Sequence, residues 1–432
     1  MIPERPMTSE RTGDSISGRV RVGFITESLV DEHFNMFEGG AERHLLNLAA
    51  VVSRLGVDVA VYQRGPRCME GSIDKIRVII RPAPLAVLGR TLASAAVADG
   101  CTHLHFQYLE RVPWRMSGTP VTATSHAVYW DFPYLAEYRQ WYPGRQLSSV
   151  ALPAWRYWQL VRNLLAVGRC RRVLATDTSL LRLVQSHRPA LRQRIEVIRN
   201  FTDFAQDMTL DEASSADQEA VEPLREAHRQ GRTVVLVPRN LSFARGGAWL
   251  CDIVERTKSL LPSGTECHFF LTGIAVDVYG QAANYQRLLY EQMAGMSPEG
   301  RQCLHLFGGL PHKTMAAAYQ LSDIVLVPTF GHEGTPLAAL EAAGFGVPVV
   351  ATNVGGLNDA VQSDITGVLV APDPEALAMA IANLVVDPDR RTRLGAAGKR
   401  MVQAGFTRDR WQKRVEGFAR GVGWADDVVA GL

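Results

Sequence analysis

Two glutamates eight positions apart, Glu333 and Glu341, stand in a segment that suits a phosphorylated, hydroxyl-rich ligand. An apolar run ends at Pro328, a polar loop carries Glu333, and Thr335-Pro336 should open a helix, because proline favours a first helical turn. The N–H groups of a helix N-terminus attract phosphate. Two carboxylates beside an anion are costly unless they bind hydroxyl groups, as ribose and hexose would offer. The pattern favours a nucleotide-sugar site, with both glutamates on one face if the helix extends back to Glu333.

A pair of arginines is expected at the same ligand. Arg239 follows the apolar run 234–238, and Arg245 comes six residues later, before Gly246-Gly247 and a helical stretch. Two guanidinium groups on a loop between a strand and a helix can neutralise a diphosphate. The alternative is a pair of surface arginines without a ligand, which the strand–loop–helix setting disfavours.

The N-terminal half offers two further candidates. Gly39-Gly40 precedes an expected helix, and glycines there let the backbone approach a phosphate or sugar closely. A plain turn explains a glycine pair equally well. Glu42 serves either the helix dipole or a ligand. His126 follows the apolar run 120–124, where a histidine has either a structural role or a place at the reacting centre.

The segment that begins at Glu333 reads EGTPLAALEAAGFGVPVVAT and resembles glycosyltransferase family 4, whose retaining GT-B members share an E-x7-E pattern. The resemblance covers most of residues 20–405. It implies an α/β fold with two Rossmann-like domains facing each other across a cleft and a C-terminal helix that crosses back. It also implies that Glu333 and His126 are catalytic at the donor hexose, beside Gly334. By the same resemblance Glu341 binds the ribose and Leu310 the base. The implied diphosphate contacts are Arg239, Arg245, Gly39, Gly40, Thr335, Pro336 and Leu337.

Some positions depart from the family pattern. Arg245 stands where lysine is usual, which keeps the charge but changes its geometry. Asn200 lies in RNFTD, where relatives have a PNG turn, and Asp359 ends a loop where glutamate is usual. Gly273 matches the glycine that follows the corresponding strand. Arg239 is therefore the better supported of the two diphosphate arginines.

The chain length of 432 residues predicts two or three domains. Apolar strands alternate with amphipathic helices on both sides of the acidic, non-periodic segment 203–222, which predicts two parallel α/β halves joined by a linker. We expect a disordered tail over 1–18, an acceptor-binding Rossmann-like domain over 19–205 and a linker over 206–229. We also expect a Rossmann-like nucleotide-sugar domain over 230–405, followed by a crossing helix within 406–432.

Composition excludes several classes of function. A net charge of +2 gives no field for nucleic acid. No apolar run reaches the roughly 18 residues of a membrane span, and the N-terminus lacks a signal-peptide core. The six cysteines form no C-x-x-C pair, which favours reduced thiols and a cytoplasmic location. His103 and His105 lack clustered carboxylates and make a poor metal site. Asp387-Pro388-Asp389 is interpreted as a helix cap.

Residues 139–172 mix tryptophan and tyrosine with arginine. The favoured interpretation is that the tryptophans pack in the core and the arginines face solvent. Two alternatives remain: a weak peripheral contact with an anionic membrane, at its inner face, and an acceptor pocket lined by aromatic rings.

These observations together favour a retaining hexosyltransferase. The donor is a nucleotide diphosphate sugar, with a UDP-sugar as the default, and the acceptor is a hydroxyl group that no motif identifies. The resemblance implies front-side departure of the diphosphate without a metal ion or a cofactor. The alternatives are a sugar-nucleotide epimerase or hydrolase on the same fold, and a non-catalytic sugar-nucleotide-binding protein.

Overall fold

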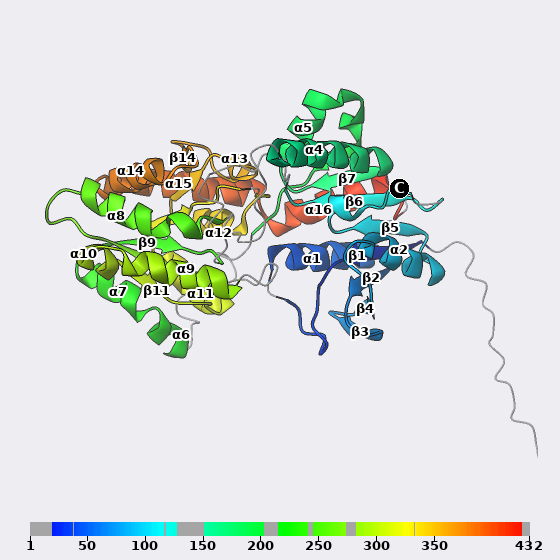
Figure 1. The fold of residues 1–432 in the computed structure, drawn as a ribbon, viewed down its shortest axis with the longest axis horizontal. Helices are drawn as coiled ribbons and strands as arrows, with labels where there is room; N and C mark the ends of the chain where they lie inside the picture. Colours follow the sequence, from blue (N-terminus) through cyan, green and yellow to red (C-terminus); the bar gives the residue numbers. More distant parts are fainter. Residues whose placement is uncertain are drawn as a thin grey trace, which may run out of the picture.

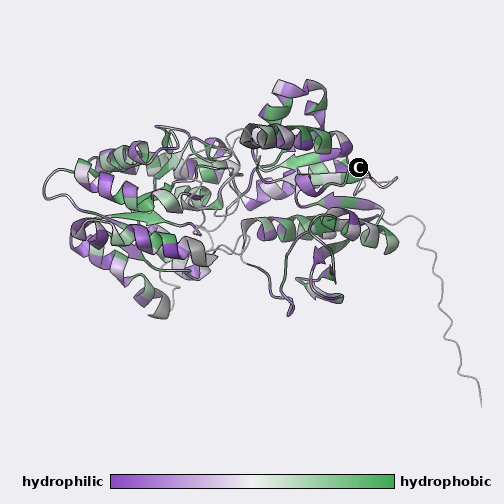
Figure 2. Ribbon diagram, viewed as in Figure 1, coloured by the Kyte–Doolittle hydropathy of each residue, from purple (hydrophilic) through white to green (hydrophobic). Residues whose placement is uncertain are grey.

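The computed structural model describes residues 20–37, 39–115, 118–127, 151–202, 215–240, 245–273, 282–331 and 333–425. Two β-sheets, each with helices on both faces, form two domains that lie side by side (Figure 1). Figure 2 shows hydrophobic strands in both sheets and helices with one hydrophilic side. Strands covered on both faces must be apolar along their whole length, which explains their continuous hydrophobic runs. The predicted α/β fold with two Rossmann-like domains is confirmed.

The N-terminal sheet has the strand order β3-β4-β2-β1-β5-β6-β7-β8. Its strands are β1 (Arg21–Thr26), β2 (Asp58–Arg64), β3 (Met69–Ile73), β4 (Ile76–Arg81), β5 (His103–Phe106), β6 (Val121–Ser125), β7 (Arg172–Ala175) and β8 (Ile195–Val197). Its helices are α1 (Gly40–Arg54), α2 (Leu88–Ala98), η1 (Leu109–Arg111), α4 (Ala151–Arg169), α5 (Ser179–His187) and η3 (Pro189–Arg194). All neighbouring strands are parallel except β3, which pairs antiparallel with β4 in an edge hairpin that the strand–helix alternation did not predict.

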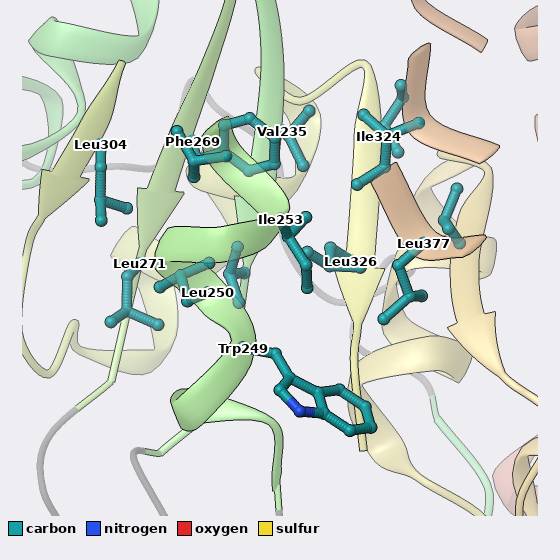
Figure 3. Packing of buried hydrophobic residues seen from close by; sticks show 14 of the residues in the cluster. Val235, Trp249, Leu250, Ile253, Phe269, Leu271, Leu304, Ile324, Leu326 and Leu377 are labelled. Carbon is teal, nitrogen blue, oxygen red and sulfur yellow. The ribbon is translucent and has the colours of Figure 1, made fainter. Parts of the chain in front are cut away.

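The C-terminal sheet has the strand order β11-β10-β9-β12-β13-β14 and is parallel throughout. Its strands are β9 (Thr233–Val237), β10 (Cys267–Leu271), β11 (Leu304–Leu306), β12 (Ile324–Val327), β13 (Val349–Thr352) and β14 (Gly367–Val370). Its helices are α6 (Ser215–Ala220), α7 (Glu222–Arg229), η6 (Gly247–Trp249), α8 (Leu250–Leu260), α9 (Ala282–Ala294), α10 (Pro298–Gln302), α11 (His312–Gln320), α12 (Leu337–Phe345), α13 (Leu357–Ala360), α14 (Pro374–Val385) and α15 (Pro388–Gly405). Figure 3 shows Leu250 and Ile253 of α8 packed with the strand residues Phe269 and Leu326.

Two local predictions can be compared with these elements. The segment 215–229 of the expected linker is largely helical, because Leu224 and Ala227 bury one side of α7 against the C-terminal domain. The Asp387 carboxylate accepts a hydrogen bond from the Arg390 N–H at 2.8 Å and so caps α15, as interpreted from the sequence. In the part of the chain that is described, no helix combines the length and the apolar character needed to cross a bilayer.

The C-terminal helix α16 (Arg408–Gly421) returns to the N-terminal domain, where it packs on α1 (Figure 1). Trp411 and Phe418 of α16 are buried in the same cluster as Phe24 of β1. Trp424, which follows the helix, is 1 % exposed, and its ring centroid lies 5.7 Å from that of Phe24. The crossing helix is therefore part of the core of the first domain.

The two histidines of β5 have different surroundings. His105 is fully buried, and its two ring nitrogens lie 2.9 Å from the hydroxyls of Thr122 and Thr124 on β6. His103 is only partly buried and lies 3.1 Å from the Thr102 hydroxyl. No group of three or more metal-ligating side chains occurs among the described residues. His105 is a structural residue whose hydrogen bonds are satisfied.

Burial lowers the pKa of His105 to about 3 and that of His44 to about 4. Below pH 6.5 these two imidazoles bind protons in the unfolded chain but not in the folded one. The free energy of unfolding should therefore fall as the pH drops from 6.5 toward 4. For His105 the loss between pH 6.5 and 5 is about 2 kcal/mol. We expect His105→Gln to lower the melting temperature at pH 7 but to flatten its decline toward pH 5. His187→Gln, on an exposed side chain, is the control; an unchanged slope in His105→Gln would contradict the assignment.

Candidate active site

The carboxyl ends of strands from both sheets meet where the two domains touch. In each sheet the strand order runs outward in both directions from one central strand, β1 in the first sheet and β9 in the second. Ligands of open α/β sheets bind at such switch points. The loops after β1, β6 and β7 face those after β9, β12 and β13. A Cβ atom on Gly40 would lie 3.7 Å from the Leu337 side chain of the other domain. The start of α1 and the start of α12, one from each half, are thus brought together.

Glu333 and Arg239 form an ion pair at this interface. The Arg239 guanidinium donates to Glu333 Oε2 and, at 3.0 Å, to the Thr329 hydroxyl, which itself donates to Glu333 Oε2 at 3.1 Å. The side chains of Arg239 and Glu333 are only 10 % and 16 % exposed. Burial alone would raise the pKa of Glu333, but Arg239 and Arg245 outweigh it and hold that pKa below its usual value. Glu333 is therefore an ionised carboxylate in a nearly dry setting.

The two glutamates of the E-x7-E pattern do not share a helix face. Helix α12 begins at Leu337 with Pro336 in the N-cap position, so Glu333 lies in the preceding loop. Glu341 belongs to α12 and accepts a hydrogen bond from the Tyr319 hydroxyl at 2.9 Å. Burial raises the pKa of Glu341, although Tyr319 and Arg43 act in the opposite direction. The helix begins beside Pro336, as predicted, and does not extend back to Glu333, so the condition for a common face is not met.

A glycine loop between β13 and α13 supports the segment that carries Glu333. The Gly356 N–H donates to the Glu333 carbonyl at 2.8 Å. A Cβ atom on Gly355 would lie 2.3 Å from the same carbonyl oxygen, and one on Gly356 would lie 2.4 Å from the carbonyl carbon of Gly334. Only residues without a side chain allow this approach. The two glycines therefore determine how closely the Glu333 loop packs on the loop between β13 and α13.

Glycines also allow close packing at the loops that carry Arg239 and Arg245. A Cβ atom on Gly273, at the end of β10, would lie 2.1 Å from the Arg239 carbonyl oxygen. Gly246 adopts a left-handed φ of 84° and packs where a Cβ atom would lie 2.2 Å from the Pro328 carbonyl oxygen. Arg245 is exposed beside it, and its charge helps to lower the pKa of Glu333. It also opposes the larger effect of burial, which raises the pKa of Glu42, so Arg245 is within electrostatic reach of a carboxylate in each domain.

The N-terminal domain contributes the start of α1. Gly39 is extended, with φ −141° and ψ 151°, and a Cβ atom there would lie 1.9 Å from Glu42 Oε2. The Glu42 side chain therefore folds back over the helix start, where burial raises its pKa. A larger residue at position 39 would displace the Glu42 carboxylate from the helix start.

His126 lies against the other histidine of the interface. Its ring centroid is 5.0 Å from that of His44 and 5.6 Å from that of Tyr108. Burial lowers the pKa of His126 well below its usual range, so the ring is neutral. Its Nε2 atom is buried and has no hydrogen-bond partner within the described residues. Such an atom is available to a ligand hydroxyl.

Direct contacts hold the two domains together around these residues. The Thr335 hydroxyl donates to the Thr176 carbonyl, and the Asn200 side-chain amide donates to the Thr335 carbonyl at 2.8 Å. The oxygen of that amide lies 3.2 Å from His44 Nδ1. Asn200, noted in the sequence because its turn departs from the family pattern, thus connects α1 to the residues that precede α12.

Asp359 forms the second set of contacts between the domains. Its carboxylate accepts hydrogen bonds from the Thr178 N–H at 2.6 Å, the Thr178 hydroxyl at 3.1 Å and Arg199 at 3.2 Å. The Asp359 side chain is 7 % exposed. A carboxylate at the start of α5 is favoured by the unpaired N–H groups there. Thr178 and Arg199 were missed from the sequence, where their position after strands is the only signal.

The predicted base contact lies at the edge of this region. Leu310 is partly buried against the core cluster that contains Tyr319, the residue that bonds Glu341. The backbone positions Gly334, Thr335 and Leu337 lie at the domain interface. The structure therefore gathers Glu333, Arg239, His126 and the start of α12 closely, with Glu341 and Leu310 further along the same domain.

Two family profiles match the chain, one for each domain. Residues 38–206 match Glycosyltransferase Family 4, and residues 231–387 match Glycosyl transferases group 1. Among solved structures, sucrose-phosphate synthase from Thermosynechococcus elongatus superposes with a TM-score of 0.70 at 20 % identity, over 94 % of this chain and 99 % of that one. Anabaena Alr3699/HepE in complex with UDP and glucose gives a TM-score of 0.66 at 17 % identity, over 93 % and 100 %. Fold, site and profiles define a GT-B protein of the glycosyltransferase class. The chain belongs to the glycosyltransferases that these two profiles describe, Glycosyltransferase Family 4 and Glycosyl transferases group 1.

Curated relatives match mainly over a short segment. D-inositol 3-phosphate glycosyltransferase of Salinispora tropica is 42 % identical over 108 residues, 24 % of this chain and 22 % of the relative. A GDP-mannose-dependent phosphatidylinositol monomannoside mannosyltransferase of Mycobacterium tuberculosis is 36 % identical over 121 residues, 26 % of this chain and 31 % of the relative. D-inositol 3-phosphate glycosyltransferase of Segniliparus rotundus matches 88 % of this chain and 83 % of itself at 24 % identity. The most similar matches thus span less than a third of the relatives' length.

Proposed function

We propose that this protein transfers a hexose from a nucleotide diphosphate sugar to an acceptor hydroxyl with retention of anomeric configuration. The observation that carries the proposal is the buried Arg239–Glu333 pair at the domain interface, beside the start of α12. A cation for the leaving diphosphate and an ionised carboxylate for sugar hydroxyls are the two groups that donor binding requires. Membership of family 4 agrees with this assignment.

The donor is positioned by residues of the C-terminal domain. The first N–H groups of α12, from Leu337 onward, and the charges of Arg239 and Arg245 bind the diphosphate. Glu341 accepts hydrogen bonds from the ribose hydroxyls, and Leu310 contacts the base. Gly39 and Gly40 approach the diphosphate from the other domain. We favour a uridine nucleotide, the one named with the Anabaena neighbour, over the GDP-mannose named with the mycobacterial relative.

In the proposed reaction the bond between the anomeric carbon and the diphosphate oxygen breaks as the acceptor oxygen bonds to the same face of that carbon. The acceptor proton passes to the departing phosphate oxygen, so no covalent sugar–enzyme intermediate is required. Arg239, Arg245 and the dipole of α12 stabilise the charge that develops on the diphosphate. Glu333 and the neutral His126 hold the hexose through its hydroxyls. We further propose that no metal ion or cofactor takes part.

A panel of nucleotide sugars tests the donor assignment. We expect UDP-glucose or another UDP-hexose to raise the melting temperature, because a ligand that binds the native state stabilises it. The responding donor is then incubated with and without simple glycosides and inositol phosphates as acceptors, in the presence and absence of EDTA. Transfer should require an acceptor, continue in EDTA and give a product whose anomeric proton shows retention by NMR.

Two outcomes would overturn the proposed reaction, and a third would change only the donor. Rapid donor turnover without acceptor indicates a hydrolase or epimerase on the same fold. Donor binding with no turnover under any acceptor indicates a sugar-nucleotide-binding protein. A response to GDP-mannose alone keeps the reaction class and replaces the uridine assignment.

We propose the cytoplasm as the location of this protein. Its cysteines are free, and Cys101, Cys170, Cys251 and Cys267 are buried, which suits a reducing compartment.

A further inference from the structure

The outer side of α4 presents aromatic side chains to solvent. Tyr157 is 69 % exposed and Trp158 49 %, and Leu165 is 37 % exposed two turns further on. Trp114, from the loop after η1, is 56 % exposed and stacks on Trp158, with ring centroids 5.9 Å apart at 21°. We call these four residues the aromatic face. The core packing favoured from the sequence is wrong for Trp158, while residues 139–150 of that segment lie outside the described residues.

The polarity of α4 is the reverse of an ordinary surface helix, whose exposed side is polar. Its inner side is buried through Ala166 and Val167, which belong to the core of the N-terminal domain. Among the α4 residues whose exposure the structure describes, the exposed ones are Ala154, Tyr157, Trp158, Leu165 and Gly168, and none of these is charged. The helix contains no aspartate or glutamate. Burial within this domain does not explain the outward tyrosine and tryptophan.

Arginines surround the aromatic face. The Arg169 guanidinium lies over the Trp114 ring, 4.4 Å from its centroid, and Arg115 is exposed next to Trp114 in the chain. Arg194 donates to the Gly168 and Cys170 carbonyls at 2.9 and 2.7 Å, at the end of α4. Arg188 and Arg192 are exposed on the adjoining η3 segment.

The positive charge is concentrated in this part of the chain. Residues 151–200 hold ten arginines against two acidic residues, Asp177 and Glu196, although the whole chain has a net charge of only +2. Asp177 is buried, and Glu196 is paired with Arg172 at 3.2 Å. The remainder of the molecule is therefore net acidic, and Arg169 and Arg115 place part of the positive charge beside the exposed aromatic rings.

We propose that the aromatic face docks on an anionic phospholipid surface, with its rings at the level of the headgroups and the arginines on the lipid phosphates. Tryptophan and tyrosine prefer that level because each combines an apolar ring with a polar group. A basic helix with an apolar side lies in the plane of such an interface. A second copy of this chain fits less well, because it would bring two arginine-rich surfaces together and four side chains offer little area for a stable dimer.

Co-sedimentation with vesicles tests this proposal on the full chain. We expect at least tenfold tighter binding to vesicles of phosphatidylcholine with 30 % phosphatidylglycerol than to phosphatidylcholine alone. The double variant Tyr157→Ser/Trp158→Ser should lose at least tenfold of that affinity, and Arg115→Gln/Arg169→Gln should lose a similar amount. Raising the salt to 0.5 M should weaken binding of the wild-type chain, because salt screens the arginines.

Tyr290→Ser is the matched control, since Tyr290 is 53 % exposed on α9 of the other domain. It should bind vesicles as the wild type does, and all variants should keep the wild-type melting temperature and its response to nucleotide sugar. Equal binding to both vesicle types, or equal loss in Tyr290→Ser, would overturn the proposal. So would a dimer seen by analytical ultracentrifugation that the Tyr157→Ser/Trp158→Ser variant abolishes, which would assign the aromatic face to a second copy. None of these outcomes bears on the donor site.

Discussion

Glu333→Gln should lower kcat by about 10²–10³-fold while nucleotide binding persists, a loss typical of removing one electrostatic group from a preorganised site. The variant keeps the shape of the side chain and removes its charge. Arg239 then loses its anionic partner in a site where both side chains are at most 16 % exposed. The hexose loses a carboxylate acceptor at the same time. Transfer kinetics and isothermal titration with free nucleotide measure the two effects separately.

The control for this variant is Glu299→Gln, on the exposed surface of α10 in the same domain. It should keep the wild-type kcat and KM. If Glu333→Gln keeps full transfer activity, Glu333 is not at the reacting hexose. If instead it loses nucleotide affinity along with activity, the pair serves to bind the diphosphate and the assignment to the sugar is wrong.

Gly334→Ala should reduce kcat/KM by at least about 100-fold, because misplacing reacting groups by an ångström has effects of that size. A Cβ atom on Gly334 would lie 2.1 Å from the His126 carbonyl oxygen and 2.8 Å from the Thr176 hydroxyl. Both neighbours belong to the other domain, and one of them is backbone. The variant must therefore hold the domains apart at the point where His126 and Glu333 should act together.

Small-angle scattering should show a larger radius of gyration for Gly334→Ala than for the wild type. Gly417→Ala, within α16, is the matched control, since a Cβ atom there meets nothing within 4 Å. That substitution should stabilise the chain by about 0.5–1 kcal/mol, because alanine favours a helix interior over glycine. Wild-type kcat/KM in Gly334→Ala would show that the close contact is not part of the working arrangement.

The sequence predicted the fold and the placing of Arg239 near Glu333, because both follow from local patterns. Arg239 and Glu333 each follow an apolar strand, and parallel strands place such residues at one edge of a sheet. The sequence predicted that the helix starts near Thr335-Pro336, but helical spacing does not describe the course of the loop that holds Glu333. The proline at 336 sets that start, and the glycine pair 355–356, distant in sequence, fixes the loop before it.

Contacts between the domains were beyond the reach of sequence patterns. Asp359 and Thr178 are 181 positions apart, and neither periodicity nor spacing links them. Asp359 was noted only as a departure from glutamate, whereas the structure gives its carboxylate a partner at the start of α5. The exposure of Trp158 was likewise missed, because composition favours burial of tryptophan without saying which side of a helix is covered.

The return of α16 to the first domain has a consequence for the newly made chain. Trp424 completes the packing around Phe24, so a strand at one end of the polypeptide is covered by residues at the other. A ribosome adds about 5–20 residues per second, which puts roughly 20–80 s between the synthesis of the two. During that time the first half exists without the side chains that close its core. The first domain should therefore be completed only after residues 406–425 are made, and a fragment ending at the linker should need those residues supplied in trans to become stable.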